Sequence, residues 1–360
     1  MKTENAVVVH HERLREFIRE VLVALGMARH IADHTAELMV RTDLRGVDSH
    51  GIGMLPKYVE WTSAGFIDPA AEPFVVRDEL ATALVDGQRG LGHWTSTKAM
   101  ALAIEKAKTF GAGFVAVRNS NHFGACACYS MMALPHELIG IAMTNSFVPA
   151  MVPTFGRKAM ISTNPLSVAV PAGTEAPFVL DMATTTVALG KLTIASRWGT
   201  PIPEGWALDE QGDPTCDPDV ALKNRLVTPL GGTRELGSHK GYGLGAVVDI
   251  LSGVLPGAVY GDLFLRTDMA ERRHTNVGHF FGAIDIARFR PVEEFTAAMD
   301  DMLSALKATP PAEGEERVWV AGEPEAECEK RRLAEGIPLA PTLVSQVNEI
   351  AHSLGVAPLA

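Results

Sequence analysis

Two histidines occur in short polar turns that are rich in small residues. His50 lies in "DSHG" and His122 lies in "NSNHFGA". Imidazole is the side chain whose unperturbed pKa lets it give or take a proton near neutral pH, so both turns could support acid–base catalysis. The alternative for each histidine is a structural role, in which the imidazole only satisfies backbone groups of its turn. We predict His50 and His122 as candidate proton-transfer groups.

Three later stretches combine small hydroxyl or amide side chains with glycine: "STNPLSVAVP", "LDMATTTVALGK" and "SHKGYGLG". The second carries one charged residue that we expect to be buried, Asp181, and the third carries Lys240. Such stretches can bind phosphate and ribose through backbone N–H groups, hydroxyls and a lysine. Thr184, Thr185 and Thr186 could equally open a helix as caps. The residue types therefore indicate a phosphate-containing ligand without requiring one.

The usual dinucleotide and metal signatures are absent from the sequence. In "GQRGLGHW" the three glycines do not have the G-x-G-x-x-G spacing, and a plain tight turn explains them equally well. Cys126 and Cys128 are too close for the usual zinc knuckle, and no second pair follows. We predict buried, inert thiols and no metal site.

The elements that position these residues are helical at both ends of the chain. Apolar residues recur at helical spacing from His10 to Leu25, Gly26 ends that helix, and a second helix stops near Leu44 to Gly46. Two further helices are predicted near the end of the chain, at residues 292–306 and 343–354.

The middle of the chain has an α/β pattern. After Pro69 the sequence indicates strand, strand, glycine loop, helix and strand, and further strands follow at "IGIAMTNS", "LSVAVPAG" and "APFVLDMA". None alternates cleanly, which suggests a sheet covered on both faces. The glycine-rich segment from Gly241 to Gly261 carries Asp249 at its middle, so we predict a buried core helix there rather than a membrane span.

Composition limits the class of protein. The 360 residues are 47% hydrophobic and 21% charged, with a formal net charge of −11. This is typical of a globular protein, for which we prefer two domains, and its charge would repel nucleic-acid phosphates. We expect no nucleic-acid or membrane partner. Four cysteines and an opening without a secretory apolar region indicate the cytoplasm.

Eight motifs in the same order resemble the malate/L-lactate dehydrogenase family, whose members lack the Rossmann fold. They are "RGVDSHG", "NSNHFGA", "STNPL", "LDMATTTVALGK", "IPEGWALDEQGDPTCDP", "HKGYGLGAVVDILSGVLPG", "NVGHFFGAID" and "VAGEPE". The resemblance implies an α/β fold: a non-Rossmann NAD(P)-binding domain with a mixed sheet at residues 76–290, and a helical domain built from residues 1–75 and 291–360.

The resemblance also implies an activity. The expected reaction is reversible hydride transfer between NAD or NADP and a small 2-hydroxy or 2-keto acid, in a homodimer. His122 is the preferred acid/base, with His50 beside it. Ser49, Arg45, Thr163 and Asn164 are expected at the substrate, and the residues expected at the cofactor are Ser146, Asp181, Met182, Ala183, Thr184, Lys240, Gly322 and Glu323.

One position departs from the family pattern. Relatives usually carry arginine four residues after the histidine of S-H-G, where it can clamp the substrate carboxylate, and this chain has Met54. We hypothesise that the substrate is bulkier or less anionic at that end than malate or lactate, or that Arg45 or Lys57 replaces the charge. Two other functions stay open: reduction of a cyclic ketimine, and dinucleotide binding without turnover.

Overall fold

The computed structural model describes residues 6–360. The elements of the first half are β1 (Val7–Val9), α1 (His11–Ala24), α2 (Arg29–Leu44), η1 (Ile52–Met54), α3 (Leu55–Ser63), β2 (Phe74–Asp78), β3 (Thr82–Asp86), α4 (Gly92–Phe110), β4 (Ala112–Ser120), α5 (Ala127–Ser130), η2 (Met131–His136), β5 (Leu138–Thr144), β6 (Leu166–Val170) and β7 (Phe178–Met182). The second half contains α6 (Leu189–Trp198), β8 (Ala207–Leu208), β9 (Pro214–Thr215), α7 (Pro218–Asn224), α8 (Ser238–Asp249), the π-helix η3 (Ile250–Val254), β10 (Val277–Asp285), η4 (Ile286–Arg288), α9 (Val292–Lys307), α10 (Glu323–Glu335), β11 (Ile337–Leu339) and α11 (Pro341–Ser353).

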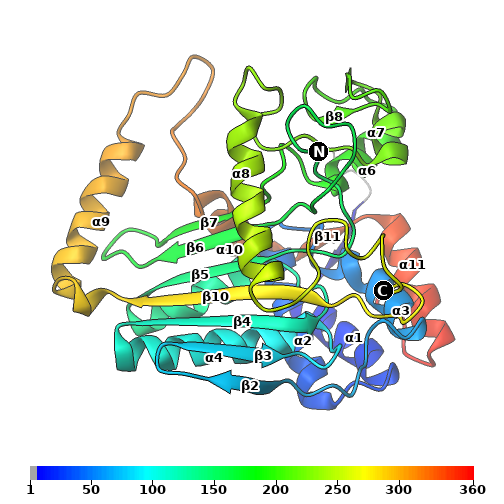
Figure 1. Cartoon of the computed structure of the whole chain (residues 1–360), viewed down its shortest axis with the longest axis horizontal. Coiled ribbons are helices and arrows are strands. Elements are labelled where there is room, and N and C mark those ends of the chain that lie inside the picture. The colour runs from blue at the N-terminus through cyan, green and yellow to red at the C-terminus, as the bar shows by residue number, and fades with distance from the viewer. Residues whose placement is uncertain (1–5) are drawn as a thin grey trace.

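A seven-stranded mixed sheet forms the centre of the molecule, in the order β2-β3-β4-β10-β5-β6-β7 (Figure 1). β3 and β4 are parallel, and the other neighbouring pairs of this sheet are antiparallel. β10, the last strand of this sheet along the chain, is inserted between β4 and β5, so a segment far along the chain completes the middle of the sheet. The predicted α/β fold with a mixed sheet is confirmed.

The two N-terminal helices form where the apolar spacing predicted them. α1 buries Leu14, Phe17 and Ile18 on one face, and Gly26 follows it with a φ of +93° that favours glycine. α2 ends at Leu44, and Gly46 has a φ of +79°. These left-handed glycines end both helices and release the chain into turns.

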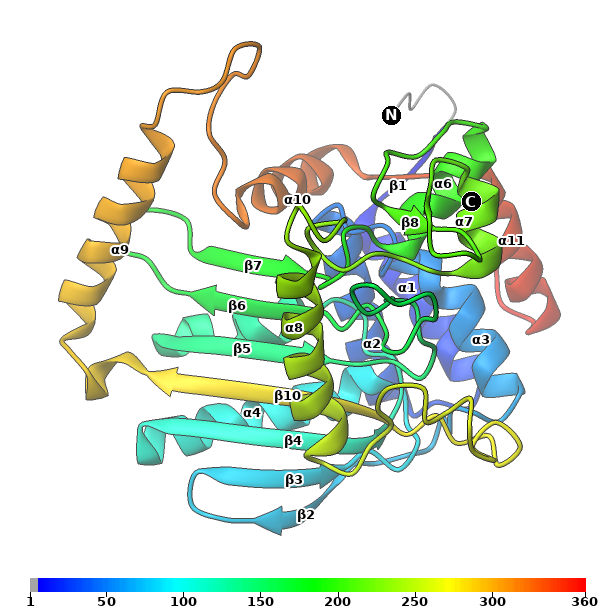
Figure 2. The same ribbon diagram turned by 45° about the horizontal axis from the view of Figure 1, so that its top comes forward.

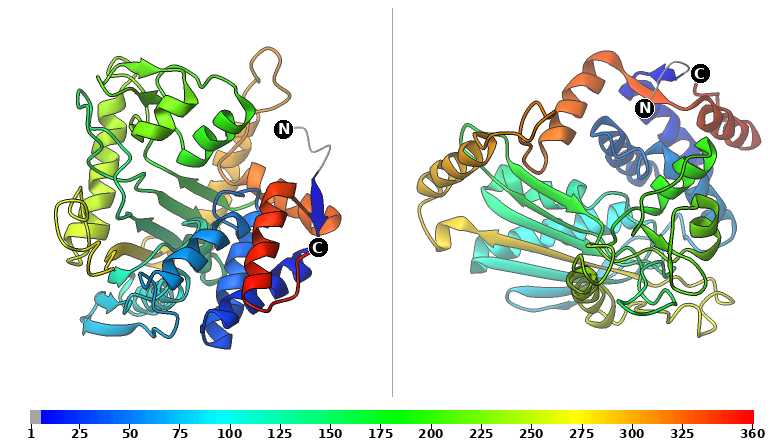
Figure 3. Two further views of the ribbon diagram at one scale, coloured as in Figure 1. Left: turned by 90° about the vertical axis from the view of Figure 1, so that its right-hand side faces the viewer. Right: turned by 90° about the horizontal axis from the view of Figure 1, so that it is seen from above.

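A helical layer contains residues from both ends of the chain. Its core includes buried side chains of α1, α2 and α3 together with Val344, Val347 and Ala351 of α11. The antiparallel pair β1 and β11 joins the two parts (Figure 3). α9 lies apart from this layer, at the opposite end of the sheet (Figure 1), with Leu303 as its buried residue. The division into residues 1–75, 76–290 and 291–360 stays a prediction.

The two faces of the sheet differ in cover. α4 packs on one face, where its apolar side chains meet Val115, Val117 and Phe281. α8 and η3 cross the strands on the other face (Figure 2). There the residues of β5 that alternate with the buried ones, such as Ile139 and Ile141, are only half-buried. The predicted cover on both faces is therefore incomplete in the single chain.

The prediction of a buried core helix at Gly241 to Gly261 is wrong for much of this segment. Gly241, Gly245 and Val248 are buried in α8, but Ile250 is 54% exposed and Leu255 is 60% exposed. Apolar residues surround the helix on all sides, so the pattern does not tell which side meets the core. Across residues 6–360, no helix combines the length and the apolar character needed to cross a membrane.

Candidate active site

The turn that carries His50 closes over a buried carboxylate. Asp43, at the end of α2, accepts a hydrogen bond from the backbone N–H of Ile52 at 2.7 Å. A Cβ on Gly51 would lie 1.9 Å from Oδ1 of Asp43. The turn therefore needs glycine directly after His50, since any side chain there would collide with the carboxylate that anchors it.

An arginine from the C-terminal part of the chain clamps the same turn. Arg332 on α10 makes a two-pronged ion pair with Asp48, in which Nη2 of Arg332 donates to Oδ2 of Asp48 at 3.1 Å. The guanidinium also donates to the backbone carbonyl of Asp43. Ser49 and His50 thus project from a turn that is held on both sides.

The imidazole of His50 has one engaged and one open nitrogen. Ser49 Oγ lies 2.8 Å from its Nδ1. Because a hydroxyl can accept or donate, this contact fits Nδ1 with or without a proton. Burial lowers the pKa of His50 from its ordinary value of 6.5. The ring stacks on His122, with 5.4 Å between the ring centroids, so the structure brings the two predicted histidines together.

His122 has a different hydrogen-bond environment. Its Nδ1 lies 3.3 Å from the backbone N–H of Gly124 and 2.7 Å from the hydroxyl of the fully buried Tyr58. An N–H can only donate, so we assign Nδ1 as the acceptor and place the proton of the neutral ring on Nε2. Burial, and then the nearby His50, holds the pKa of His122 well below its ordinary value.

A cavity of about 400 Å³ lies between the end of α2, the start of α5, β7 and the segment that leads into α10. Its walls are mainly apolar. The predicted site residues that line it are Ser49, His50, Arg45, Thr163, Asp181, Met182, Ala183 and Gly322.

Charged side chains of both signs face this cavity. Arg45 pairs with Glu329 at 3.1 Å, whereas Arg41 contacts Sδ of Met131 at 3.9 Å instead of a carboxylate. Asp181 accepts the N–H of Ala127 at 2.8 Å, and its side chain stays open to the solvent of the cavity. The protein atoms around the cavity still keep much of the bulk water away from this carboxylate. This desolvation raises the pKa of Asp181 to about 6, although the N–H of Ala127 and the charge of Arg45 lower it.

Gly322 allows the segment before α10 to close one wall. Its φ is +96°, and a Cβ there would lie 2.9 Å from Cβ of Val179. The N–H of Val179 donates to the carbonyl of Ala321 at 3.0 Å. This close approach joins the late "VAGEPE" motif to the free edge of β7.

The other predicted site residues do not line this cavity. Asn164 is buried and donates to the carbonyl of Gly245 at 2.9 Å and to Asp249 at 3.2 Å. Thr184 Oγ1 donates to the carbonyl of Thr163 at 3.1 Å. Four predicted site residues remain. His122 is stacked on His50, and Ser146 is half-buried after β5. Lys240 is exposed on α8, and Glu323 accepts the N–H of Val320 at 2.9 Å.

The two positions discussed as charge replacements also differ. Arg45 lines the cavity, whereas Lys57 is exposed and pairs with Glu60 at 2.7 Å. Met54 packs against the core of the helical layer. The prediction that Cys126 and Cys128 are buried thiols is confirmed, and both residues also line the cavity. Their inertness stays a prediction.

Sequence reasoning missed Tyr58, Arg41 and Trp319. Tyr58 and Leu55 are the buried residues of α3, and their three-residue spacing could have placed Tyr58 on the inner face of that helix. Arg41 is one helical turn before Arg45 and faces the same cavity. Trp319 directly precedes the late motif and carries no spacing signal of its own.

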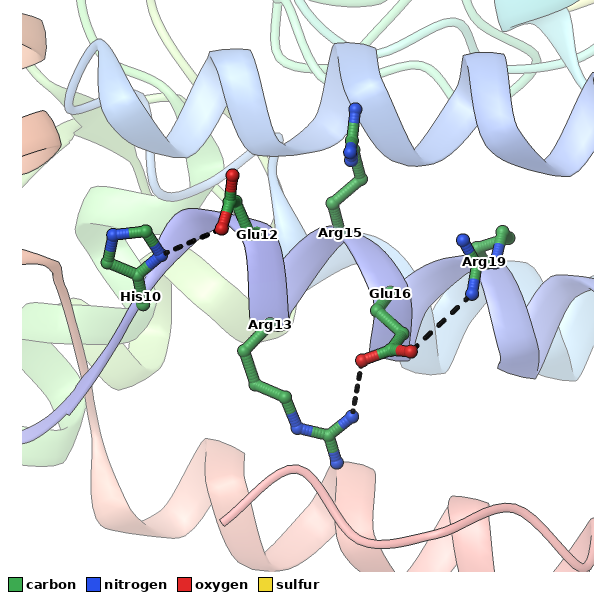
Figure 4. A pocket seen from close by; sticks show the side chains of 6 residues that line it. All are labelled: His10, Glu12, Arg13, Arg15, Glu16 and Arg19. Carbon is green, nitrogen blue, oxygen red and sulfur yellow. Dashed lines mark hydrogen bonds and ion pairs between the residues drawn. The ribbon is translucent and has the colours of Figure 1, made fainter.

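A second hollow lies on the surface of α1 (Figure 4). Its charges neutralise one another, since Glu16 lies 3.4 Å from Arg13 and 3.7 Å from Arg19. This is the solvated face of an amphipathic helix. It lies on a different face of α1 from the buried side chains and shares no residue with the cavity beside His50.

The sequence is similar over nearly its whole length to known proteins. Residues 9–348 match the family model described as malate/L-lactate dehydrogenase. The chain is 41% identical to malate dehydrogenase of Pyrococcus abyssi, over 98% of this chain and 96% of that protein. It is 39% identical to L-sulfolactate dehydrogenase of Methanocaldococcus jannaschii, over 97% and 98% respectively.

Solved structures give the same result. Malate dehydrogenase from Entamoeba histolytica superposes with a TM-score of 0.94 at 33% identity, covering 98% of this chain and 99% of that chain. Delta1-piperideine-2-carboxylate reductase from Pseudomonas syringae pvar. tomato superposes with a TM-score of 0.84 at 27% identity, covering 96% and 100%.

Proposed function

The chain belongs to the malate/L-lactate dehydrogenase family and is a dehydrogenase of hydroxy acids that uses a nicotinamide cofactor; we propose that its reaction takes place at the cavity beside His50. The observation that carries this proposal is the stacked pair of imidazoles, one of which lines a cavity with both charged and apolar walls.

The cavity suits a nicotinamide dinucleotide. Its volume of about 400 Å³ falls in the ordinary range for ligand pockets. Asp181 and Glu325 offer carboxylates that can accept ribose hydroxyls, and Arg41 offers a guanidinium for phosphate. When bound, the nicotinamide supplies or accepts the hydride. Calorimetric titration with NAD and with NADP identifies the preferred dinucleotide.

The hydrogen bonds favour a division of labour between the histidines. We assign proton exchange with the substrate to His50, because its contact with Ser49 Oγ tolerates either protonation state. His122 instead keeps its proton on Nε2, since its Nδ1 accepts hydrogen bonds from the hydroxyl of Tyr58 and the N–H of Gly124. During reduction, protonated His50 gives its Nε2 proton to the substrate oxygen. We propose that this oxygen reaches past His50 to the N–H of His122, which is stacked on His50 outside the lining of the cavity, and that this N–H stabilises the developing charge. The sequence alone favoured His122 for the first role.

For the substrate carboxylate we propose Arg45 rather than Lys57. Arg45 lines the cavity, although Glu329 partly neutralises it, whereas Lys57 is exposed and engaged by Glu60. A partly neutralised cation is a weaker clamp than a free arginine. We therefore propose that Arg45 replaces the missing charge and that the substrate is held less tightly at its carboxylate than by a free arginine.

A cyclic ketimine is the second candidate substrate, supported by the structural likeness to the piperideine-2-carboxylate reductase. Both reactions need a hydride and a proton at adjacent atoms, so the same histidines would serve. The rate of cofactor oxidation with pyruvate, compared with the rate with piperideine-2-carboxylate, separates the two.

We also propose a homodimer, with α8 and η3 in the interface. This face exposes the apolar side chains Leu244, Val247, Ile250, Val254 and Leu255, and a face of this kind marks an interaction surface. Analytical ultracentrifugation should show a dimer for the wild type and a monomer for Ile250→Glu. A monomeric wild type would reject this part of the proposal. A cytoplasmic location remains our expectation, supported by the free thiols.

The function is tested with a panel of 2-hydroxy and 2-keto acids and both dinucleotides. The wild type should turn over at least one of these acids, and His50→Asn should bind the dinucleotide with almost no turnover. Saturable dinucleotide binding without oxidation or reduction of any acid would favour the non-catalytic alternative.

A further inference from the structure

Trp319 is a large aromatic side chain that lines the cavity while remaining 46% exposed. The guanidinium of Arg317 lies 3.6 Å from the centre of its ring, and Glu327 pairs with that guanidinium. Arg317 does not line the cavity, whereas Trp319 does. The arginine therefore covers one face of the ring, while the indole still lines the cavity and keeps nearly half of its surface exposed.

The position of Trp319 along the cavity follows from β7. Residues 179–183 all line the cavity, and at about 3.3 Å per residue this edge spans roughly 13 Å. At the Val179 end, the N–H of Val179 donates a hydrogen bond to the carbonyl of Ala321, which is two residues after Trp319. Beyond the other end of β7, the cavity continues to Ala188 at the start of α6, and the next turn approaches Ser49, with a Cβ at Gly190 lying 3.5 Å from Cβ of Ser49.

We propose that Trp319 is the platform on which the adenine ring of the bound dinucleotide stacks, with the nicotinamide at the opposite end beside His50. This inference rests on the proposed function, which puts the cofactor in this cavity. A purine is a flat aromatic ring, and stacking on an indole face needs no hydrogen bond from the side chain. Arg317 holds the indole by a cation–π contact on one face of the ring. The platform serves NAD and NADP alike, because both carry adenine.

Other exposed aromatic residues do not share this combination. Phe155 is 86% exposed and Phe289 is 79% exposed, and neither lines the cavity. Their rings have no covering cation among the cation–π contacts within residues 6–360. Exposure alone is ordinary for surface residues, and what distinguishes Trp319 is that it lines the cavity and has a guanidinium over one face of its ring.

The test measures the affinity of cofactor fragments by calorimetry. Trp319→Ala should raise the Kd of ADP-ribose by about 10-fold, within the range expected for one base–aromatic stack. The Kd of reduced nicotinamide mononucleotide, which has no adenine, should stay unchanged. Trp319→Phe should bind ADP-ribose nearly as well as the wild type, because a phenyl ring still offers a stacking face.

Phe289→Ala serves as the matched control, since it removes an exposed aromatic ring away from the cavity. Equal ADP-ribose affinity in Trp319→Ala and the wild type would overturn the inference and leave the proposed function standing. A loss in Trp319→Phe as large as in Trp319→Ala would also overturn stacking. A wild type that binds neither dinucleotide would overturn the inference and the proposed function together.

Discussion

The turns that carry His50 and His122 look alike in sequence but hold their imidazoles differently. Each combines a histidine with serine or asparagine and glycine. The first is fixed by carboxylates and Arg332, and its ring contacts a hydroxyl that can donate or accept. The second receives two donors at Nδ1. The surroundings, and not the motif, therefore decide which imidazole can change its protonation state freely.

Replacement of His50 should have the largest effect. His50→Asn keeps a polar side chain that cannot carry a proton near neutral pH, so kcat should fall by about 10² to 10⁴-fold, the usual contribution of general acid–base catalysis. Steady-state kinetics and dinucleotide titration measure the two quantities separately. His50→Ala should be equally impaired, because neither replacement can exchange a proton.

Replacement of His122 sharpens the comparison. His122→Ala removes a fixed N–H, and the loss of one such donor costs about 10² to 10³-fold in kcat. His122→Asn should recover part of that loss, since an amide can donate a hydrogen bond. Equal impairment in the two variants would return the acid–base role to His122, and near-normal kcat in both would leave His50 as the only histidine of the site.

The glycine of the first turn should matter for stability. Gly51→Ala places a Cβ against the carboxylate of Asp43, and overpacking of this kind should lower the free energy of unfolding by about 2 to 3 kcal/mol. Urea denaturation measures the change. Gly243→Ala on α8 is the control, because nothing lies within 4 Å of the added carbon. A stable Gly51→Ala variant would contradict the anchoring role of Asp43.

Removal of the Tyr58 hydroxyl should have a moderate effect. Tyr58→Phe deletes one donor to His122 Nδ1, so it should raise the pKa of that ring and lower kcat by about 2- to 10-fold, the worth of one hydrogen bond. In the wild type, oxidation needs neutral His50, whose pKa lies below 6.5. The rate of oxidation should therefore fall as the pH drops through the lowered pKa of His50, at a lower pH than for an ordinary histidine.

The pH profile also separates the two histidines. Tyr58→Phe should leave the acidic limb of the profile in place, because that limb belongs to His50. A limb that moves upward in this variant would identify His122 as the titrating group. Asp181→Asn is the control for the other group that titrates nearby, with its pKa of about 6.

The smallest effect is expected at Lys57. Because its ammonium is exposed and pairs with Glu60, Lys57→Met should leave the KM of the acid substrate almost unchanged. Arg45→Met should raise that KM clearly, because it removes a positive charge from the cavity. The reverse pattern, measured with the same substrate, would move the carboxylate partner out of the cavity.

The sequence predicted much of the fold because most elements are locally encoded. The helical spacing of α1 and the left-handed glycine after it were both readable, as was the strand pattern leading from residues 74 to 120. It failed at α8, where apolar residues on every side conceal which face is exposed. The insertion of β10 between β4 and β5 depends on contacts between distant segments, which no local pattern records.

The site was predictable only through its motifs. Residues of several motifs meet in one cavity, as Ser49, Asp181 and Gly322 do. Asn164 and Thr184 share the same residue types but turn inward to satisfy buried backbone and carboxylate groups. Tyr58 meets His122 across 64 positions of the chain, and such a pairing appears only when the fold brings α3 against the second turn.

The most direct test of the central claim is a crystal structure with dinucleotide and a 2-hydroxy acid bound. We predict that the nicotinamide ring lies in the cavity and that the substrate hydroxyl is within about 2.6 to 3.2 Å of Nε2 of His50, the distance required for proton transfer. A nicotinamide bound outside this cavity, or a substrate oxygen out of reach of both imidazoles, would contradict the account.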